Sequence, residues 1–172
     1  FVIALGYKST VIKEYFLNYY ALNNDFEVDL SSGEIRYINK NTENWNVTLI
    51  DTGINTMTGG RIKRLQQVIG DDDFMVTYGD GLSNINIHKL IEFHKNSGKI
   101  ATLSAVFPTA RFGELDIDET NCVKTFKEKP QLETGRINGG FFVFKSKVFD
   151  FIDGDETILE RDPMETLVAK NE

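Results

Sequence analysis

Short apolar runs alternate with amphipathic helical patterns along the first two thirds of this chain. Strand-like runs fall at 1–6, 74–78 and 100–107, and helical stripes at 10–20, 61–69 and 87–97. This alternation is typical of a sheet that carries helices on both faces. The sequence therefore predicts the α/β fold class, with a doubly wound, Rossmann-like mixed sheet that is mainly parallel.

The later segments suggest a small additional β region. Residues 113–118, 123–127 and 139–144 read as strands with little helix between them, and 34–39 and 45–51 are shorter candidates. At 172 residues and 41% apolar content, the chain is long enough for one domain with a real core. We expect a single domain over residues 1–172, truncated at both ends because Phe1 opens inside an apolar run.

Charge and cysteine content narrow the partners. Twenty-six acidic residues against 19 basic ones give a net charge of −7, which argues against nucleic acid or an anionic membrane as a general partner. Cys122 is the one cysteine, so an internal disulfide or a cysteine-based zinc site is excluded. No apolar run approaches the ~20 residues that span a bilayer. The expected location is the cytoplasm.

Residues 74–81, FMVTYGDG, form an apolar run that ends in a carboxylate between two glycines. A strand would fix Asp80, and the glycines would let backbone and phosphate approach closely, which suits a metal-bound phosphate ligand. Gly-Asp-Gly is also good turn chemistry, so a plain tight turn stays open as the alternative.

Residues 56–61, TMTGGR, join a strand region to a helix. Glycines at a helix start are expected to leave backbone N–H groups facing outward, where they attract anions or nucleotide bases. The spacing is neither a Walker loop nor a dinucleotide fingerprint. The alternative is a glycine-opened helix with Arg61 solvated in its first turn.

Two further segments could hold a sugar phosphate. In Glu128-Lys129-Pro130 the proline holds Lys129 extended as a possible phosphate clamp, although a solvated charged turn is the alternative. In Asn138-Gly139-Gly140 the amide and the glycine backbone could bind sugar hydroxyls, although a hairpin turn is the alternative.

Covalent catalysis has no support in the sequence. His88 and His94 lie on a predicted helix remote from the glycine segments, and surface positions are expected for both. Ser83, Ser104 and Cys122 lack the local context of an activated nucleophile.

Taken together, TGGR at 58–61, YGDG at 78–81, EKP at 128–130 and NGGFFV at 138–143 resemble the sugar-phosphate nucleotidyltransferases, in particular the glucose-1-phosphate cytidylyltransferases. The pattern extends to 6–8, 45–49, 51–53 and 111–113, so the likeness covers nearly all of the chain. The motifs are specific in combination and weak one by one.

The resemblance implies transfer of CMP from CTP to α-D-glucose 1-phosphate, which gives CDP-glucose and pyrophosphate for deoxysugars of surface polysaccharide such as O-antigen. It implies Mg²⁺ as cofactor and a homo-oligomer, with a hexamer among the candidate forms. In such enzymes the sugar phosphate attacks in line, so positioning and charge neutralisation supply most of the rate. No protein nucleophile is needed.

The same resemblance assigns roles by motif. Asp80 would ligate magnesium and, with Lys129, act in catalysis, Lys129 by holding the phosphate of glucose 1-phosphate. The nucleotide would be bound by Thr56, Met57, Gly59, Gly60, Arg61 and Gly79. The sugar phosphate would be bound by Glu128, Lys129, Asn138 and Gly139.

The departures from the family pattern shape the remaining alternatives. The GGxGTR loop, the KPK lysine pair and the W-x-P-M-D-T segment of the family are absent from the 172 residues, so this piece alone is expected to be inactive. Thymidylyl, uridylyl, adenylyl or guanylyl transfer is one alternative. A metal-dependent glycosyltransferase is another, although residues 79–81 carry one acid where its D-x-D motif has two. A non-catalytic sugar-nucleotide binding subunit is the third.

Overall fold

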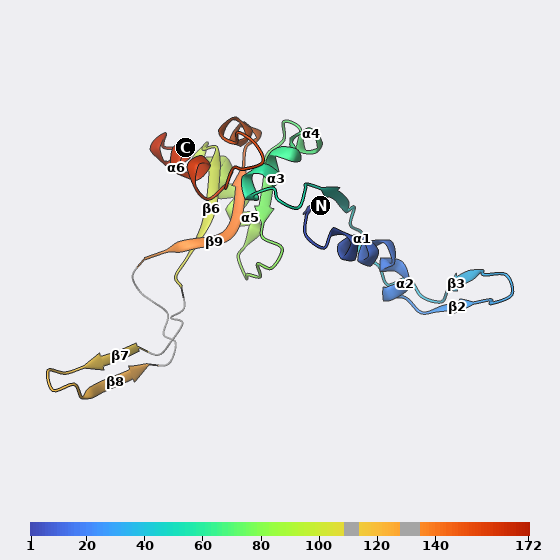
Figure 1. Ribbon diagram of the computed structural model, residues 1–172, viewed down its shortest axis with the longest axis horizontal. Coiled ribbons are helices and arrows are strands. Elements are labelled where there is room, and N and C mark those ends of the chain that lie inside the picture. The colour runs from blue at the N-terminus through green and yellow to red at the C-terminus, as the bar shows by residue number, and fades with distance from the viewer. Residues whose placement is uncertain (109–113, 128–134) are drawn as a thin grey trace. The chain divides into compact units, whose positions relative to one another are not determined.

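The computed structural model describes residues 1–108, 114–127 and 135–172 (Figure 1). The described strands are β1 Val2–Leu5, β2 Phe26–Val28, β3 Ile35–Tyr37, β4 Thr48–Asp51, β5 Phe74–Thr77, β6 Ala101–Val106, β7 Glu114–Ile117, β8 Val123–Lys127 and β9 Ile137–Phe144. The described helices are α1 Ser9–Leu17, α2 Tyr19–Asn23, α3 Thr58–Arg64, α4 Gln66–Ile69, α5 Ile87–Ser97, the 3₁₀ helix η1 Ser146–Phe151 and α6 Asp162–Ala169.

The chain divides into two compact units. Unit 1 holds residues 1–70 and 149–166, and unit 2 holds residues 71–148 and 167–172. The expectation of a single domain over residues 1–172 stays a prediction.

Unit 1 is built on a short parallel pair of strands. β1 pairs with β4 in parallel, with Val2 opposite Thr48 and Leu5 opposite Asp51. The expected helix over 10–20 is divided into α1 and α2 at Asn18, whose side-chain amide donates to the Glu14 carbonyl at 2.8 Å. An amide that bonds the carbonyl four residues back competes with the helical backbone, which explains the break.

A β-hairpin follows α2 in unit 1. β2 and β3 pair antiparallel, with Glu27 opposite Arg36, and these two side chains also form an ion pair. The sequence predicts only the second of these strands and assigns β2 to a polar loop, which is wrong. Three residues are too few to show a period of two, so the pairing is visible only in the fold.

The core of unit 1 lies under α3. Its buried apolar side chains are 8% exposed or less, and they are Leu5, Ile62, Leu65, Phe149, Ile152 and Leu159. Each such side chain stabilises the fold by about 1.5–3 kcal/mol relative to an exposed position. The core of unit 1 therefore takes side chains from β1, from α3 and the residue after it, and from residues 149–159.

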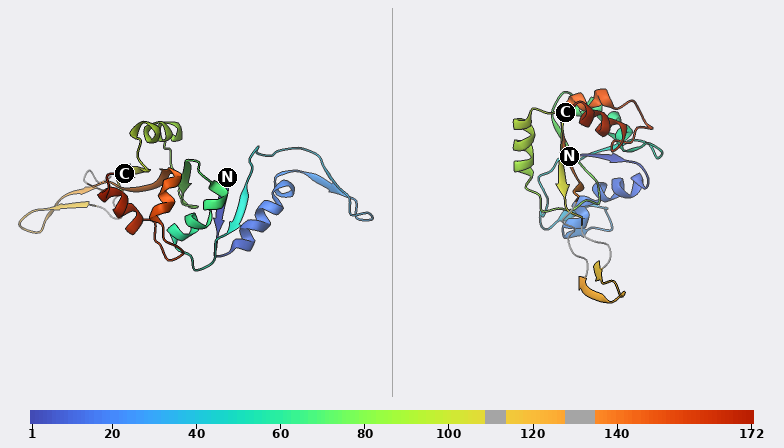
Figure 2. Two further views of the ribbon diagram at one scale, coloured as in Figure 1. Left: turned by 90° about the horizontal axis from the view of Figure 1, so that it is seen from above. Right: turned by 90° about the vertical axis from the view of Figure 1, so that its left-hand side faces the viewer.

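Unit 2 contains a three-stranded sheet in the order β5-β9-β6. β9 is antiparallel to both neighbours, so β5 and β6 run parallel to each other and are connected through α5. The Asn86 side chain accepts from the Lys89 amide at the start of α5, and Gly98 ends the helix in the left-handed region, as the sequence predicts. Figure 2 shows α5 against one face of this sheet.

The core of unit 2 follows the central strand. Phe142, Val143 and Phe144 of β9 are at most 3% exposed, and the rings of Phe142 and Phe144 stack with their centroids 5.5 Å apart. Successive side chains of a strand point to opposite faces, so the burial of all three shows that β9 is covered on both faces, which explains the continuous apolar run. The other buried apolar side chains of unit 2 are Leu90, Ile100, Val148 and Leu167.

The strand directions correct one expectation. Among the described strands, the β1–β4 pair is parallel and the other pairings are antiparallel, where the sequence predicts a mainly parallel sheet. The alternation of apolar runs with helical patterns predicts where strands lie but not in which direction they run. β9 lies between β5 and β6 and runs antiparallel to both. The described architecture is a mixed α/β fold with small sheets.

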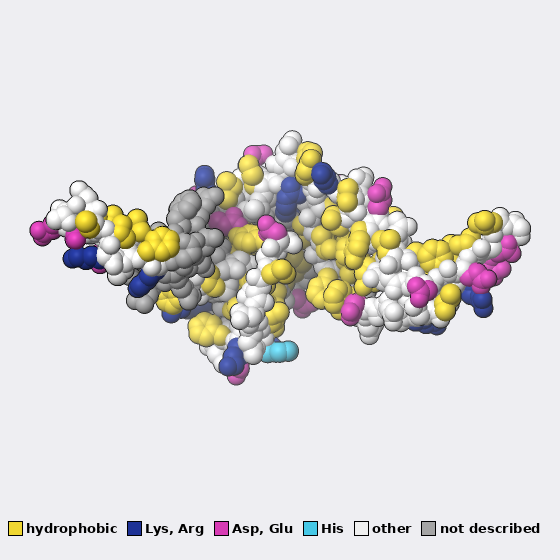
Figure 3. All heavy atoms as spheres, turned by 90° about the horizontal axis from the view of Figure 1, so that it is seen from below, with side chains coloured by type: hydrophobic (Ala, Val, Ile, Leu, Met, Phe, Trp, Pro, Cys, Tyr) yellow, Lys and Arg dark blue, Asp and Glu magenta, His cyan; other side chains and the backbone are white. Residues whose placement is uncertain are grey.

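The additional β region is the antiparallel hairpin of β7 and β8, seen at the left of Figures 1 and 3. Its apolar side chains are about half exposed or more, and they are Leu115, Ile117, Val123 and Phe126. Figure 3 shows hydrophobic side chains along this hairpin. Over the described part of the chain, no helix combines the length and apolar character needed to cross a membrane.

Candidate functional site

The glycine-arginine segment 56–61 opens α3 in unit 1, but its amides do not face outward. The Met57 N–H donates to the Asp155 carbonyl at 2.8 Å. The N–H groups of Gly59 and Gly60 donate to the Thr157 carbonyl at 2.9 and 3.2 Å. The prediction of free amides at this helix start is therefore wrong, because residues 154–160 supply carbonyl acceptors for them.

The two glycines allow residues 154–160 to approach the helix closely. A Cβ at Gly60 would lie 2.5 Å from the Asp155 carbonyl oxygen, and one at Gly59 would lie 2.8 Å from that of Thr157. The Thr58 hydroxyl adds a side-chain contact, since it donates to Glu160 at 2.7 Å and accepts from an amide of the same segment. The glycines thus have a packing role that the sequence does not reveal.

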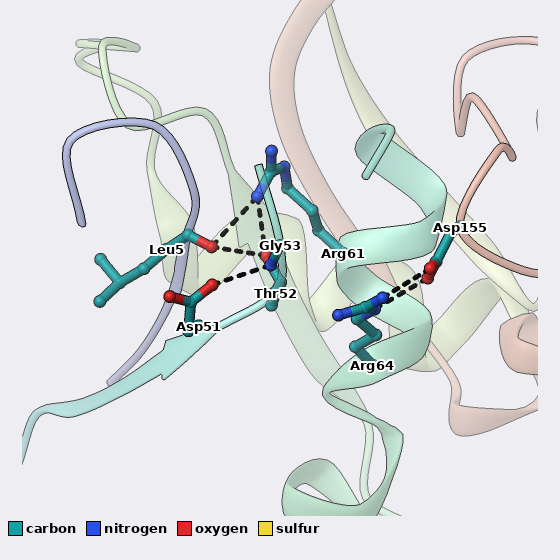
Figure 4. A network of polar contacts seen from close by, with 7 residues as sticks. All are labelled: Leu5, Asp51, Thr52, Gly53, Arg61, Arg64 and Asp155. Atoms are coloured by element: carbon teal, nitrogen blue, oxygen red, sulfur yellow. Dashed lines mark hydrogen bonds and ion pairs between the residues drawn. The ribbon is translucent and has the colours of Figure 1, made fainter. Parts of the chain in front are cut away.

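Arg61 is half-buried and turned away from the axis of α3 (Figure 4). Its guanidinium donates to the Leu5 carbonyl at 3.1 Å, to the Thr52 hydroxyl at 2.8 Å and to the Ile54 carbonyl at 3.4 Å. The solvated first-turn alternative is therefore wrong. A cation near a helix start is disfavoured by the helix dipole, and these oxygen acceptors offset that cost.

Arg64 and Asp155 anchor residues 154–160 to α3 from the side (Figure 4). Arg64 Nε donates to Asp155 Oδ1 at 2.8 Å and Nη2 to Oδ2 at 2.5 Å. The Arg64 hydrogen bonds lower the pKa of Asp155, and the same pair raises the pKa of Arg64. Neither residue is predicted from the sequence as part of a site, since the two lie 91 positions apart and neither stands in a recognisable motif.

Asp80 follows β5 in unit 2 on a tight turn, closed by a hydrogen bond from the Gly81 N–H to the Tyr78 carbonyl at 3.2 Å. Its side chain is exposed, and within the described ranges no hydrogen bond or ion pair engages it. A Cβ at Gly79 would meet no atom of the described residues within 4 Å. The turn is therefore real, and it leaves both the carboxylate and the space beside Gly79 open to a ligand.

A magnesium site at Asp80 would have one protein carboxylate from the described residues. No group of three or more histidine, cysteine or acidic side chains gathers among them to hold a metal ion. Mg²⁺ usually keeps several waters and binds through one or two carboxylates together with substrate phosphates. An exposed, unengaged aspartate fits a magnesium ion that arrives with a triphosphate.

Asn138 and Gly139 lie in β9 of unit 2, so the hairpin-turn alternative is wrong. The register between β6 and β9 shifts beside Leu103 and Ala105, which is a β-bulge in the strand pair. A Cβ at Gly139 would lie 2.6 Å from the Ser104 hydroxyl, so this glycine serves the close approach of the two strands.

Tyr78 connects the Asp80 turn to Asn138. The Asn138 Nδ2 group donates to the Tyr78 hydroxyl at 3.3 Å, and Asn138 Oδ1 accepts from the Gly140 N–H at 2.8 Å. In unit 2 the predicted metal ligand therefore lies on the turn after β5, and the predicted sugar ligand Asn138 lies in β9, the strand paired with β5.

The other predicted site residues are distributed as follows. Thr56, which is 7% exposed, lies with Met57, Gly59, Gly60 and Arg61 in unit 1. Gly79, Asp80, Asn138 and Gly139 lie in unit 2. Glu128 and Lys129 lie outside the described residues. The ligand contacts assigned to all of these residues stay predictions.

His94 is buried in unit 2 at 1% exposure, whereas the sequence predicts a surface position. His88 is exposed as predicted. The Nδ1 atom of His94 lies 2.9 Å from the Thr102 hydroxyl, and Nε2 has no hydrogen-bond partner among the described residues. Burial lowers the pKa of His94 below its ordinary value; the negative charge of Asp73 raises the pKa by a smaller amount, and the positive charge of Lys145 lowers it further. The helical period places His94 four residues after Leu90, on the same buried face of α5, so its burial could have been predicted from the sequence.

The α/β fold and the glycine, carboxylate and amide segments agree with the comparisons to known proteins. The family model described as Nucleotidyl transferase matches residues 11–168. The chain therefore belongs to the nucleotidyl transferase family. It is 47% identical to the glucose-1-phosphate cytidylyltransferase of Salmonella typhi, over all of this chain and 67% of that protein. The resemblance found in the motifs is thereby confirmed.

Two further likenesses support this placement. The chain is 42% identical to the probable glucose-1-phosphate cytidylyltransferase of Bacillus subtilis, again over all of this chain and 67% of the relative. The crystal structure of HddC from Yersinia pseudotuberculosis matches with a TM-score of 0.60 at 25% identity, over 94% of this chain and 62% of that one. The chain thus spans about two thirds of the length of the proteins it matches.

Proposed function

We propose that the protein to which this chain belongs transfers CMP from CTP to α-D-glucose 1-phosphate, forming CDP-glucose and pyrophosphate. The observation that carries the proposal is the 47% identity, over the whole of this chain, to a relative named for that reaction. The open carboxylate of Asp80 beside Gly79 supports the same chemistry. The described segments supply part of the machinery, and the remaining third of the relatives' length is outside this chain.

The reaction is an in-line displacement at phosphorus. A phosphate oxygen of glucose 1-phosphate forms a bond to the α-phosphorus of CTP while the bond from that phosphorus to the bridging oxygen breaks, and pyrophosphate leaves with that oxygen. Bound Mg²⁺ would supply charge neutralisation at the phosphates. Because the sugar phosphate is itself the nucleophile, the protein acts by holding the two substrates in line.

The residues divide this work in the following way. Asp80 holds the metal, Gly79 gives the nucleotide room, and Asn138 and Gly139 bind the sugar. Residues 56–61 bind the cytidine portion of CTP. Residues 154–160 keep that segment in its conformation through hydrogen bonds to its amides. Lys129 binds the phosphate of the sugar, and Glu128 a sugar hydroxyl.

The nucleotide is tested with a panel of five triphosphates. The full-length protein is incubated with glucose 1-phosphate, Mg²⁺ and CTP, UTP, dTTP, ATP or GTP, and pyrophosphate release is followed. We expect CTP to be used with a kcat/KM at least about tenfold above the others, equivalent to about 1.4 kcal/mol of discrimination. Equal use of UTP and CTP defeats the cytidylyl assignment and leaves a broader sugar nucleotidyltransferase.

The proposal also covers the sheet of the whole protein, its oligomeric state and its location in the cell. The small sheets described above form part of a doubly wound sheet in the whole protein, as the match to HddC supports. A homo-oligomer, with a hexamer as the form to test, is expected and is measured by light scattering. A cytoplasmic location follows from the use of a nucleoside triphosphate as substrate.

A further inference from the structure

We propose that Tyr78 is a positioning residue for the sugar, and that it acts by fixing the carboxamide of Asn138. The inference rests on the proposed function, because it takes Asn138 as a sugar ligand. Its basis is the hydrogen bond from Asn138 Nδ2 to the Tyr78 hydroxyl at 3.3 Å. Tyr78 also precedes Gly79 and Asp80 directly, so one residue joins the metal turn to the sugar strand.

The carboxamide of Asn138 is held at both ends. Its Oδ1 accepts from the Gly140 N–H at 2.8 Å, and its Nδ2 donates to Tyr78. A primary amide has two N–H donors and two lone pairs on its oxygen. One donor and one lone pair are used by these contacts, which leaves one of each for a ligand. A sugar hydroxyl both donates and accepts one hydrogen bond, so it matches this remainder.

The two contacts fix the amide in different ways. The Gly140 N–H can only donate, so it fixes Oδ1 as the end of the amide that faces it. A tyrosine hydroxyl both donates and accepts, so Tyr78 does not choose between the two orientations. It holds the Nδ2 end that Gly140 leaves on its side, and it thereby fixes the plane of the carboxamide that is offered to the sugar.

The ring of Tyr78 is itself fixed by packing. It meets the Phe142 ring edge-on with the centroids 6.0 Å apart, and Phe142 is fully buried. It also lies against Gly140, where a Cβ would come within 2.8 Å of the tyrosine ring and where φ is +78°. Both the close approach and the positive φ require glycine at this position. The bulge in β9 thus provides the slot in which Tyr78 sits.

The test is a double-mutant cycle in the full-length protein, with Tyr78→Phe and Asn138→Ala made singly and together. Tyr78→Phe keeps the ring and removes the hydroxyl. Loss of the hydrogen bond from Asn138 predicts a KM for glucose 1-phosphate about threefold to tenfold higher, with the KM for CTP within about twofold of wild type. In the Asn138→Ala background the same change should have a clearly smaller effect, because the part that acts through the amide is already lost.

Tyr37→Phe is the matched control, since Tyr37 lies in the β2–β3 hairpin and packs against Tyr20 and Phe26. It should leave both KM values unchanged. Effects of Tyr78→Phe and Asn138→Ala that multiply independently, or a rise in KM for CTP as large as that for the sugar, overturn the inference. A wild type without turnover would instead count against the proposed function. A crystal structure of Tyr78→Phe gives a readout without turnover: a displaced Asn138 carboxamide is expected, and an unchanged one contradicts the inference.

Discussion

Arg64 of α3 and Asp155 are joined by two parallel hydrogen bonds of 2.8 and 2.5 Å, across 91 positions of sequence. The Asp155 backbone carbonyl in turn accepts the Met57 N–H at the start of the same helix. One residue therefore contacts α3 through its side chain and its backbone. This relationship explains how residues 154–160 are held against the glycine-arginine segment.

The ion pair between Arg64 and Asp155 predicts that the free energy of unfolding falls at acidic pH. The Arg64 hydrogen bonds lower the pKa of Asp155 below its ordinary value of 3.8, so the folded state binds the proton less tightly than the unfolded state. The contribution should be full above the ordinary pKa and lost as the pH falls through the lowered one. In urea unfolding, the difference between wild type and Asp155→Asn should be constant from about pH 5 to 8 and shrink below about pH 4. Asp153→Asn, at an exposed neighbouring position, is the control, and a difference that grows in acid would contradict the account.

Gly60→Ala should destabilise unit 1. Its Cβ would lie 2.5 Å from the Asp155 carbonyl oxygen and 2.6 Å from the Asp155 Cα, so the backbone of residues 154–160 must move. We expect the free energy of unfolding to fall by about 1–3 kcal/mol, as measured by urea denaturation. Gly154→Ala is the matched control, because a Cβ there meets no atom within 4 Å in the part of the chain that the structure describes. Equal stability of the two variants would show that the close approach is not needed.

The burial of His94 predicts a second dependence of stability on pH, which here comes from a basic side chain and not an acidic one. Burial lowers the pKa of His94, so the unfolded chain binds its proton more readily than the folded one. Stability should be full above the ordinary pKa of 6.5 and decline as the pH falls below it. The urea midpoint should drop between about pH 7.5 and 5.5, and His94→Gln should flatten that slope. His88→Gln, at an exposed site on the same helix, should keep the slope of the wild type.

Asp80→Asn should nearly abolish turnover in the full-length protein while leaving the fold intact. The amide keeps the shape of the side chain but removes the charge that a magnesium ion requires. We expect kcat to fall by at least about a hundredfold, with an unchanged circular dichroism spectrum. Asp72→Asn, an exposed acidic residue at the other end of β5, should retain the activity of the wild type. Wild-type activity in Asp80→Asn would remove Asp80 from the metal site.

Local signals in the sequence located several elements well. The helix expected over 87–97 is α5, because both of its ends are marked by residues that act on their own backbone, Asn86 and Gly98. The strand expected over 123–127 is β8, because its alternation is bounded by turn residues. The turn at Asp80 is likewise indicated by three adjacent residues, Gly79-Asp80-Gly81.

Contacts between distant segments could not be predicted in the same way. The amides of Met57, Gly59 and Gly60 donate to carbonyls about 100 positions later in the chain. Without that partner segment, a helix that starts with glycines has the sequence pattern of an open anion site. The same holds for Arg61, whose acceptors include the Leu5 carbonyl, and for the insertion of β9 between β5 and β6. Periodicity reports which face of an element is apolar, and it does not report what covers that face.

The central claim is that CMP is joined to glucose 1-phosphate, and phosphorus NMR of one reaction tests it most directly. The full-length protein is mixed with CTP, α-D-glucose 1-phosphate and Mg²⁺, and the phosphorus signals are followed over time. The account predicts that CTP and the sugar phosphate disappear together as CDP-glucose and pyrophosphate appear in equal amounts. CTP hydrolysis without a sugar nucleotide, or no reaction by a folded full-length protein, would contradict it.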